Sequence, residues 1–302
     1  MDGPVRHGRP RAPPWPGGLP PRTYAWRVRT AYRARRSRRR RTVRIGDTKL
    51  TYVPDGAVQF DPRAWFPGGV EDVWTDYLNE SGHLVGGVGA LLVERGERAL
   101  LIDAGFGPYA IPPRPGEPRQ GIHGGALPDN LAALGRSSDR IEAVAFTHLH
   151  LDHIGWARTP GFAVPNYLVS QQEWAERHLL GVRGVTEEML QVMAPRVRTV
   201  IDGEEVFPGV RVMLAPGHTA GHATYVISDG GRRVIAFGDA MHSPLQIAHP
   251  DWSSVVDLDP RASAKERRRL VEELAAPEAI GFGVHFADVV FGRVRQGAWQ
   301  PL

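Results

Sequence analysis

Short apolar segments recur along the chain, and most have the length and spacing of β-strands. Residues 43–53 alternate apolar and polar positions as one half-buried strand does, and residues 88–94 and 98–105 are typical of a hairpin that turns around Gly96. Further strands are predicted at residues 141–146, 210–215, 224–228, 234–237 and 279–284. The chain is therefore rich in strands from its first third to its end.

Three segments have the apolar spacing of helices instead, namely residues 127–134, 170–178 and 263–274. Ser170 can cap the second helix, with Glu173 three residues on, and Glu266 stands in the corresponding capping-box position of the third. Helices and strands alternate in both halves. This order predicts an α/β protein in which sheets and helices form layers.

Composition narrows the class of protein. The chain has 302 residues, of which 42% are hydrophobic, enough to build the core of one large domain. No apolar run approaches the roughly 20 residues that a membrane-spanning helix needs, so we expect no membrane span. The absence of cysteine excludes disulfides, a thiolate nucleophile and thiolate metal ligands. We expect a cytoplasmic enzyme, and the absence of cysteine is compatible with this location.

Charge divides the chain into two parts. Residues 1–44 contain 14 arginines and one acidic residue, which leaves 23 basic and 32 acidic residues for the remainder. The isoelectric point near 9.7 thus describes one terminal segment and is a poor argument for a nucleic-acid partner. Residues 1–42 are rich in Pro, Gly and Arg and lack periodic apolar positions, which predicts a disordered extension before a domain at residues 43–302. We favour a solvated extension without a function of its own. The alternatives are an electrostatic arm and a targeting segment.

The densest chemistry follows the predicted strand at residues 141–146, in the sequence THLHLDHIGW. Residues i and i+2 of an extended segment point the same way, so His148 and His150 can reach one ion. The following turn can direct Asp152 and His153 toward a second ion. Imidazole and carboxylate ligands suit borderline divalent metals such as zinc. The loop therefore predicts two incomplete halves of a two-metal centre.

More candidate ligands follow later strands. PGHTAGH offers His218 and His222, GDA offers Asp239, and the strand predicted at residues 279–284 ends at His285. Each lies where an apolar strand stops, and functional residues gather in such loops. The isolated histidines lack this context, and we interpret them as surface or pocket residues: His83, His123, His178 and His249.

The ordered motifs HxHxDH, PGHTxGH, GDA and a late strand-end histidine resemble those of the metallo-β-lactamase superfamily, from about residue 44 to the C-terminus. The resemblance implies an αββα sandwich. It implies that one metal is held by His148, His150 and His218, that the other is held by Asp152, His153 and His285, and that Asp239 bridges both. His222 would support the ligands without binding, and Asp103 would orient the first metal-binding loop.

The resemblance also implies a mechanism and a branch. Two divalent ions, zinc before Mn, Fe or Co, would lower the pKa of a shared water molecule to about 7. The resulting hydroxide would attack an ester, lactone or phosphotriester, with Asp152 and Asp239 at the reacting centre. The residues after Asp239 resemble the methyl parathion hydrolase branch, a neighbour of the acyl-homoserine lactonases. His242 either donates to the substrate or supports the ligands. The early aromatics either line the pocket mouth or pack an outer loop: Phe60, Trp65 and Phe66.

Alternative functions share part of this pattern. A thioesterase resembling glyoxalase II has the same ligand motifs but usually adds a basic helical segment, and only a short sequence follows His285. A mononuclear iron dioxygenase shares HxHxDH and differs in metal count. A non-catalytic, nucleic-acid-associated protein would act through the Arg-rich segment. The superfamily resemblance also allows a homodimer, which no residue pattern demonstrates.

Overall fold

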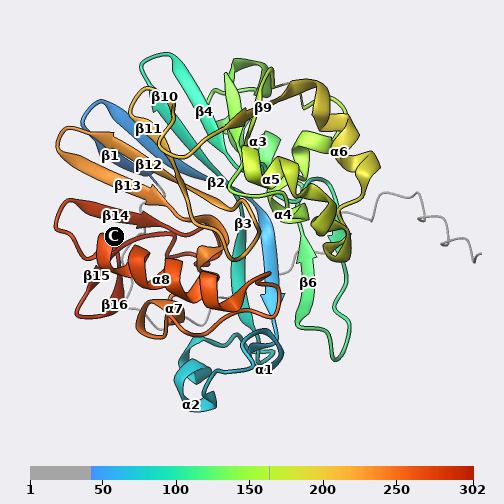
Figure 1. Ribbon diagram of the computed structural model, residues 1–302, viewed down its shortest axis with the longest axis vertical. Helices are drawn as coiled ribbons and strands as arrows, with labels where there is room; N and C mark the ends of the chain where they lie inside the picture. Colours follow the sequence, from blue (N-terminus) through green and yellow to red (C-terminus); the bar gives the residue numbers. More distant parts are fainter. Residues whose placement is uncertain (1–41, 163) are drawn as a thin grey trace, which may run out of the picture.

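Two β-sheets pack face to face in the computed structural model, which describes residues 42–162 and 164–302 (Figure 1). The predicted disordered extension falls outside the described residues, except that Thr42 already belongs to the first strand. None of the helices in the described ranges is long and apolar enough to cross a membrane.

The first sheet has nine strands. Its antiparallel half carries long strands, and its other half continues in parallel from β4 to β9. In spatial order the strands are β5 (Ala110–Ile111), β6 (Arg119–His123), β2 (Thr48–Phe60), β3 (Leu84–Arg95), β4 (Arg98–Ile102), β7 (Ala143–Ala145), β8 (Tyr167–Ser170) and β9 (Val197–Val200), with β1 (Thr42–Ile45) paired to β2.

The second sheet has seven strands in simple chain order, and only the pair β13 and β14 is parallel. They are β10 (Glu205–Phe207), β11 (Val210–Leu214), β12 (Ala223–Asp229), β13 (Arg232–Ala236), β14 (Ala279–Phe282), β15 (Phe291–Arg295) and β16 (Ala298–Pro301). The long helix α8 (Pro260–Leu274) makes the crossover between the two parallel strands. Every strand segment predicted from residue 88 onward therefore exists, with slightly different ends.

The single strand predicted at residues 43–53 is wrong, because β1 and β2 form a hairpin there. Gly46 has a φ of +50°, a backbone conformation open to glycine at little cost, and it allows the tight turn. The carboxylate of Asp229 accepts the backbone N–H groups of Asp47 and Thr48, each at 3.0 Å. A residue 181 positions away thus fixes a turn that the alternating pattern hides.

The remaining helices of the described chain are short. They are α1 (Pro62–Trp65), α2 (Glu71–Trp74), η1 (Thr75–Tyr77), α3 (Leu127–Ala133), η2 (Ser138–Arg140), α4 (Leu151–Ile154), η3 (Trp156–Arg158), α5 (Gln171–Ala175), η4 (Arg177–Arg183), α6 (Glu187–Met193), η5 (Ala194–Arg196), η6 (Gly238–Ala240) and α7 (Leu245–Ala248). The helix predicted at residues 127–134 is confirmed as α3. The one predicted at 170–178 is shorter, since α5 ends at Ala175 and a 3₁₀ helix follows.

The capping of α8 differs from the prediction. The helix begins at Pro260, and the carboxylate of Asp259 accepts the N–H groups of Arg261 and Ala262 at 3.0 Å. Aspartate before proline is a strong helix start, because its side chain satisfies free N–H groups and proline needs none. Glu266 instead pairs with Arg269 inside the helix. The helix therefore starts three residues before the predicted position.

Apolar clusters hold the layers together. Between the sheets, Leu91 and Leu100 pack with Val212, Tyr225 and Phe282. A second cluster joins the outer face of the first sheet to α3 and α6, and a third joins the second sheet to α8. Helices on both outer faces of two stacked sheets make the αββα sandwich that the sequence motifs implied.

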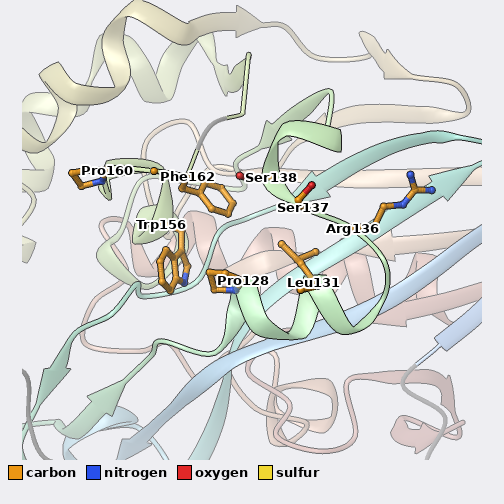
Figure 2. Close-up of a pocket in the computed structure, with 10 residues that line it drawn as sticks. Pro128, Leu131, Arg136, Ser137, Ser138, Trp156, Pro160 and Phe162 are labelled. Carbon is orange, nitrogen blue, oxygen red and sulfur yellow. The ribbon is translucent and has the colours of Figure 1, made fainter.

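A cavity of about 320 Å³ lies on the helix-covered side of the first sheet (Figure 2). Pro128 and Leu131 of α3 face Trp156 and Phe162 across it, and Arg136 lies at its edge. None of the motif histidines lines this cavity. It is therefore separate from the site described next.

Candidate metal centre

The HxHxDH loop starts where β7 ends, and Asp103, just after β4, holds it in place. The Asp103 carboxylate accepts the Thr147 backbone N–H at 2.8 Å and the Thr147 hydroxyl at 3.0 and 3.1 Å, and it lies 2.9 Å from Nδ1 of His153. Asp103 has a φ of +62°, a conformation that Asp tolerates better than most residues. Its contacts agree with the orienting role that the superfamily resemblance implied.

Two groups of side chains converge beyond the strand ends. Their candidate ligand atoms lie within 4.8 Å of one another in each group, and the members are His148, His150, His218 and Asp239 in the first and Asp152, His153 and His285 in the second. All seven residues were singled out from the sequence, and they come from four separate loops. Groups of this kind can hold divalent metal ions.

The carboxylate of Asp239 faces both groups with different oxygens. Oδ1 lies 3.2 Å from Nε2 of His153 and 3.1 Å from Nε2 of His285, both in the second group. Oδ2 lies 3.4 Å from Nε2 of His218 and 3.8 Å from Nε2 of His148, both in the first group. Asp152, the third member of the second group, has its Oδ2 3.7 Å from Nε2 of His285.

Several inward-facing atoms lack a hydrogen-bond partner within the described ranges. Nε2 of His148, Nε2 of His153 and Oδ1 of Asp239 are all buried in this state. Burying an unsatisfied polar group costs about 1–3 kcal/mol, so a native protein normally supplies a partner. Imidazole nitrogen and carboxylate oxygen are the donor set of zinc and similar ions. The residues present therefore fit a divalent metal.

The other ring nitrogens are fixed by the protein. Nδ1 of His218 lies 2.9 Å from Oδ1 of Asp257, and Nδ1 of His285 lies 2.7 Å from the carbonyl oxygen of Gly87. Nδ1 of His148 contacts the Thr147 hydroxyl at 3.1 Å. Metal-binding histidines usually bond to the protein through one nitrogen and bind the ion with the other, because this fixes the ring and its tautomer.

The electrostatics of the cluster centre on one carboxylate among imidazoles. Burial and neighbouring imidazoles hold the pKa of His148 and His150 well below the usual range. Burial also opposes ionisation of Asp239, but the surrounding histidines, His285 and His153 first, hold its pKa well below the usual range. Burial opposes protonation of His153, but the carboxylates of Asp239 and Asp103 hold the pKa of His153 well above the usual range, so a metal ion must displace that proton when it binds.

Glu173 joins the loop of His148 and His150 to the loop of His218, and it does not form the capping box that the sequence predicts. Ser170 does cap α5, accepting the Glu173 N–H at 3.0 Å, but the Glu173 side chain turns inward and makes no capping box. Its carboxylate accepts the Leu149 N–H at 3.1 Å, the Thr219 hydroxyl at 2.6 Å and the Gly221 N–H at 3.0 Å. It thereby ties the loop of His148 and His150 to the loop of His218.

Glu173→Gln is expected to lower metal affinity about 10- to 100-fold, the usual effect of removing a group that orients ligands. A glutamine oxygen can still serve Thr219, but the amide NH₂ would then face the Leu149 N–H. Competition titration with a chelator measures this affinity. Glu176→Gln, on a half-exposed side chain three residues later, is the matched control and should bind metal normally. Wild-type affinity in Glu173→Gln would contradict the linking role.

A buried ion pair supports the first group from behind and has no signature in the sequence. Asp257 accepts from the Ser254 hydroxyl at 2.9 Å as well as contacting His218, and its Oδ2 lies 3.1 Å from the Arg267 guanidinium. Both paired side chains are wholly buried. Burial opposes ionisation of Asp257, but the bond to His218 and the nearby charges lower its pKa.

His222 and His242 both adjoin Asp239 in different ways. Nε2 of His222 accepts the backbone N–H of Asp239 at 3.1 Å, and burial lowers the pKa of His222 to about 3. His222 thus holds the Asp239 backbone as a neutral ring. Nε2 of His242 lies 3.2 Å from Oδ2 of Asp239, and within the described residues neither of its ring nitrogens has a hydrogen-bond partner.

Of the three early aromatics, Phe60 and Trp65 lie beside the histidine cluster, whereas Phe66 does not. Trp65 meets the His242 ring edge-on at 5.3 Å between centroids, and Phe60 meets the rings of His285 at 6.1 Å and His242 at 6.3 Å. Phe66 instead packs on Trp252. All three aromatics are buried, so Phe60 and Trp65 form a wall beside the cluster. None of the isolated histidines joins either metal-type group within the described residues, and His249 stacks on Trp252.

The model of the metallo-beta-lactamase superfamily matches residues 84–280, well over half of the chain. The chain belongs to the metallo-beta-lactamase superfamily. The match includes every motif residue discussed above except His285. This residue lies shortly after the end of β14. No curated protein is significantly similar to the chain in sequence.

Several solved structures share the fold of this chain. AbOPH, described as a hydrolase in the beta-lactamase superfamily, is 22% identical with a TM-score of 0.74, covering 88% of this chain and 98% of its own. AidC, a dizinc quorum-quenching lactonase in complex with a product, is 22% identical with a TM-score of 0.72, covering 86% and 96%. AiiA from B. thuringiensis, with N-decanoyl-L-homoserine bound, is 21% identical with a TM-score of 0.60, covering 82% and 95%.

Proposed function

We propose that the chain is a dinuclear, metal-dependent hydrolase that cleaves an ester or lactone, with phosphotriesters as further substrates. His148, His150 and His218 would hold one ion, Asp152, His153 and His285 the other, and Asp239 would bridge them. The observation that carries the proposal is the division of the Asp239 carboxylate, whose two oxygens face the two groups separately. The lactonase and hydrolase names of structures with the same fold support it.

Two bound divalent ions, zinc before Mn, Fe or Co, would acidify a water molecule to a pKa near 7 and polarise the scissile carbonyl or phosphoryl group. The chain's own residues then have distinct tasks. Asp239 keeps the two groups together and, as a secondary role, can carry the proton released. Asp152, whose side chain is 11% exposed, completes the second group. His242 faces Asp239 with ring nitrogens that have no partner in the described residues, and it can donate a hydrogen bond to the oxygen that gains charge.

A substrate comparison tests the reaction class. We expect the zinc-loaded protein to hydrolyse an aryl oxoester or a lactone faster than the matched acyl thioester, and to lose this activity when a chelator removes the metal. Phenolate or acid release measured by absorbance or pH provides the rates. Activity that survives complete metal removal would refute the proposal, and a strong preference for the thioester would favour the glyoxalase II-like alternative.

The residues that follow His285 include the strands β15 and β16, which complete the second sheet. The rates on the thioester and the oxoester decide between the hydrolase proposal and the glyoxalase II-like alternative. The nucleic-acid alternative depends on residues 1–41, which lie outside the described residues. The hydrolase proposal depends on neither segment.

A further inference from the structure

Arg183 lies beside the first metal-binding loop, at the end of η4. Its guanidinium donates a hydrogen bond to the carbonyl oxygen of Val255 at 3.3 Å, and the Val255 N–H donates to the carbonyl oxygen of Trp65 at 3.0 Å. The next residue, Gly184, adjoins the loop itself, because a Cβ placed there would lie 3.5 Å from Cδ1 of Leu151. Arg183 therefore stands between the aromatic wall and the loop of His150.

Arg119 lies beside the same wall. It is paired with Phe60 across β2 and β6, where the register of the two strands shifts between Gln59 and Phe60. Phe60 meets the rings of His242 and His285, so the backbone of Arg119 adjoins a residue that contacts the cluster. Asp61, the next residue, donates its N–H to the carbonyl of Pro118 at 2.9 Å, which fixes this corner.

Neither arginine is neutralised by a carboxylate within the described residues. Several arginines of this domain pair with acids, as Arg98 does with Glu142, whereas Arg119 and Arg183 belong to those that have no described carboxylate within 4.0 Å. Both side chains are only half-exposed. Burial lowers the pKa of Arg183, the charge of Asp257 opposes this, and repulsion by Arg119 adds to it. Asp257 is already engaged by His218 and Arg267.

Two unpaired cations beside a metal site suit an anion that arrives with the substrate. Guanidinium groups bind carboxylates and phosphates by charge-assisted, often bidentate hydrogen bonds. The rest of the domain is acidic overall, with 32 acidic and 23 basic residues after residue 44, so this local positive charge is not part of a general basic surface. Focused charge of this kind selects and steers ligands of opposite sign.

We propose that Arg119 and Arg183 form a subsite for an oxyanion, a carboxylate or a phosphate, on the part of the substrate that is not cleaved. This inference rests on the proposed hydrolase function and adds a substrate class to it, namely anionic esters or lactones. The two arginines bind and orient the substrate and take no part in bond cleavage.

Matched esters test the subsite. The mono-4-nitrophenyl ester of glutaric acid carries a terminal carboxylate, and 4-nitrophenyl valerate is a neutral ester of similar length. We expect the zinc-loaded wild type to favour the anionic ester in kcat/KM. Arg183→Gln and Arg119→Gln should each reduce this preference about tenfold, mainly through KM, because each removes a charge-assisted contact. Arg211→Gln, at an exposed arginine paired with Glu205, should keep the wild-type preference.

The outcomes separate the two proposals. An unchanged preference in both Arg183→Gln and Arg119→Gln overturns the subsite even if hydrolysis is fast. If the metal-loaded wild type hydrolyses neither ester, the proposed function fails, and calorimetric binding of glutarate and of inorganic phosphate still tests the subsite. Binding that is equally strong in wild type and Arg183→Gln would refute it, and stronger binding of one probe identifies the anion. If Arg183→Gln does not fold, Arg183→Lys retains the charge and should retain most of the preference.

Discussion

Asp239→Asn is expected to lower kcat/KM by at least about 10³-fold and to reduce the amount of bound metal. A bridging ligand must offer charge to both groups, and the Asp239 oxygens lie 3.1–3.4 Å from His285, His153 and His218. An amide offers one neutral oxygen and turns an NH₂ group toward the other group. Metal-ion catalysis contributes several kcal/mol, and each 1.36 kcal/mol changes a rate tenfold.

The measurement pairs steady-state hydrolysis of an aryl ester with elemental analysis of the same sample. Asp251→Asn is the matched control, because Asp251 is exposed and pairs only with Arg268 at the surface in the described structure. The control should keep wild-type activity and metal content. If Asp239→Asn also retained both, the carboxylate would not be the link between the two groups.

Arg267→Met is expected to lower the free energy of unfolding by about 3–5 kcal/mol. The substitution preserves most of the volume but leaves Asp257 as a buried carboxylate without its cation. It also removes the bonds of Arg267 to the carbonyl of Pro250 at 2.6 Å and to the Ser253 hydroxyl at 2.5 Å. Breaking one side of a buried pair costs more than losing a surface pair, because the remaining charge cannot reach water.

Urea denaturation followed by fluorescence of the tryptophans measures this loss. The adjacent Arg268→Met removes an exposed surface pair and should change the free energy of unfolding by no more than about 0.5 kcal/mol. Equal stability of the two variants would show that Asp257 does not depend on Arg267. Because Asp257 contacts Nδ1 of His218, we also expect Arg267→Met to bind metal more weakly than Arg268→Met.

The sequence predicts the strands and the converging ligands well for a physical reason. Apolar runs such as residues 234–237 record burial locally, and the candidate ligands Asp239 and His285 lie just beyond the ends of such runs. The assignment of the seven residues to two groups follows from the resemblance of the motifs to the superfamily, and the structure brings the same residues, spread from position 148 to position 285, close together.

The rest of the site depends on partners far apart in the chain. Glu173 has the position of a capping residue, and only the folded chain brings Leu149, Thr219 and Gly221 to its carboxylate. Arg267 lies in a helix rich in charges, and no local pattern distinguishes it from the exposed Arg268. Long-range packing decides which charges are buried. The local sequence therefore does not predict the groups that hold the candidate ligands in position.

Metal stoichiometry tests the central claim most directly. The protein is saturated with zinc, freed of excess ion by gel filtration and analysed for zinc per chain. The account predicts two zinc ions per chain in the wild type. One ion or none per chain in folded, saturated protein would contradict a dinuclear centre bridged by Asp239.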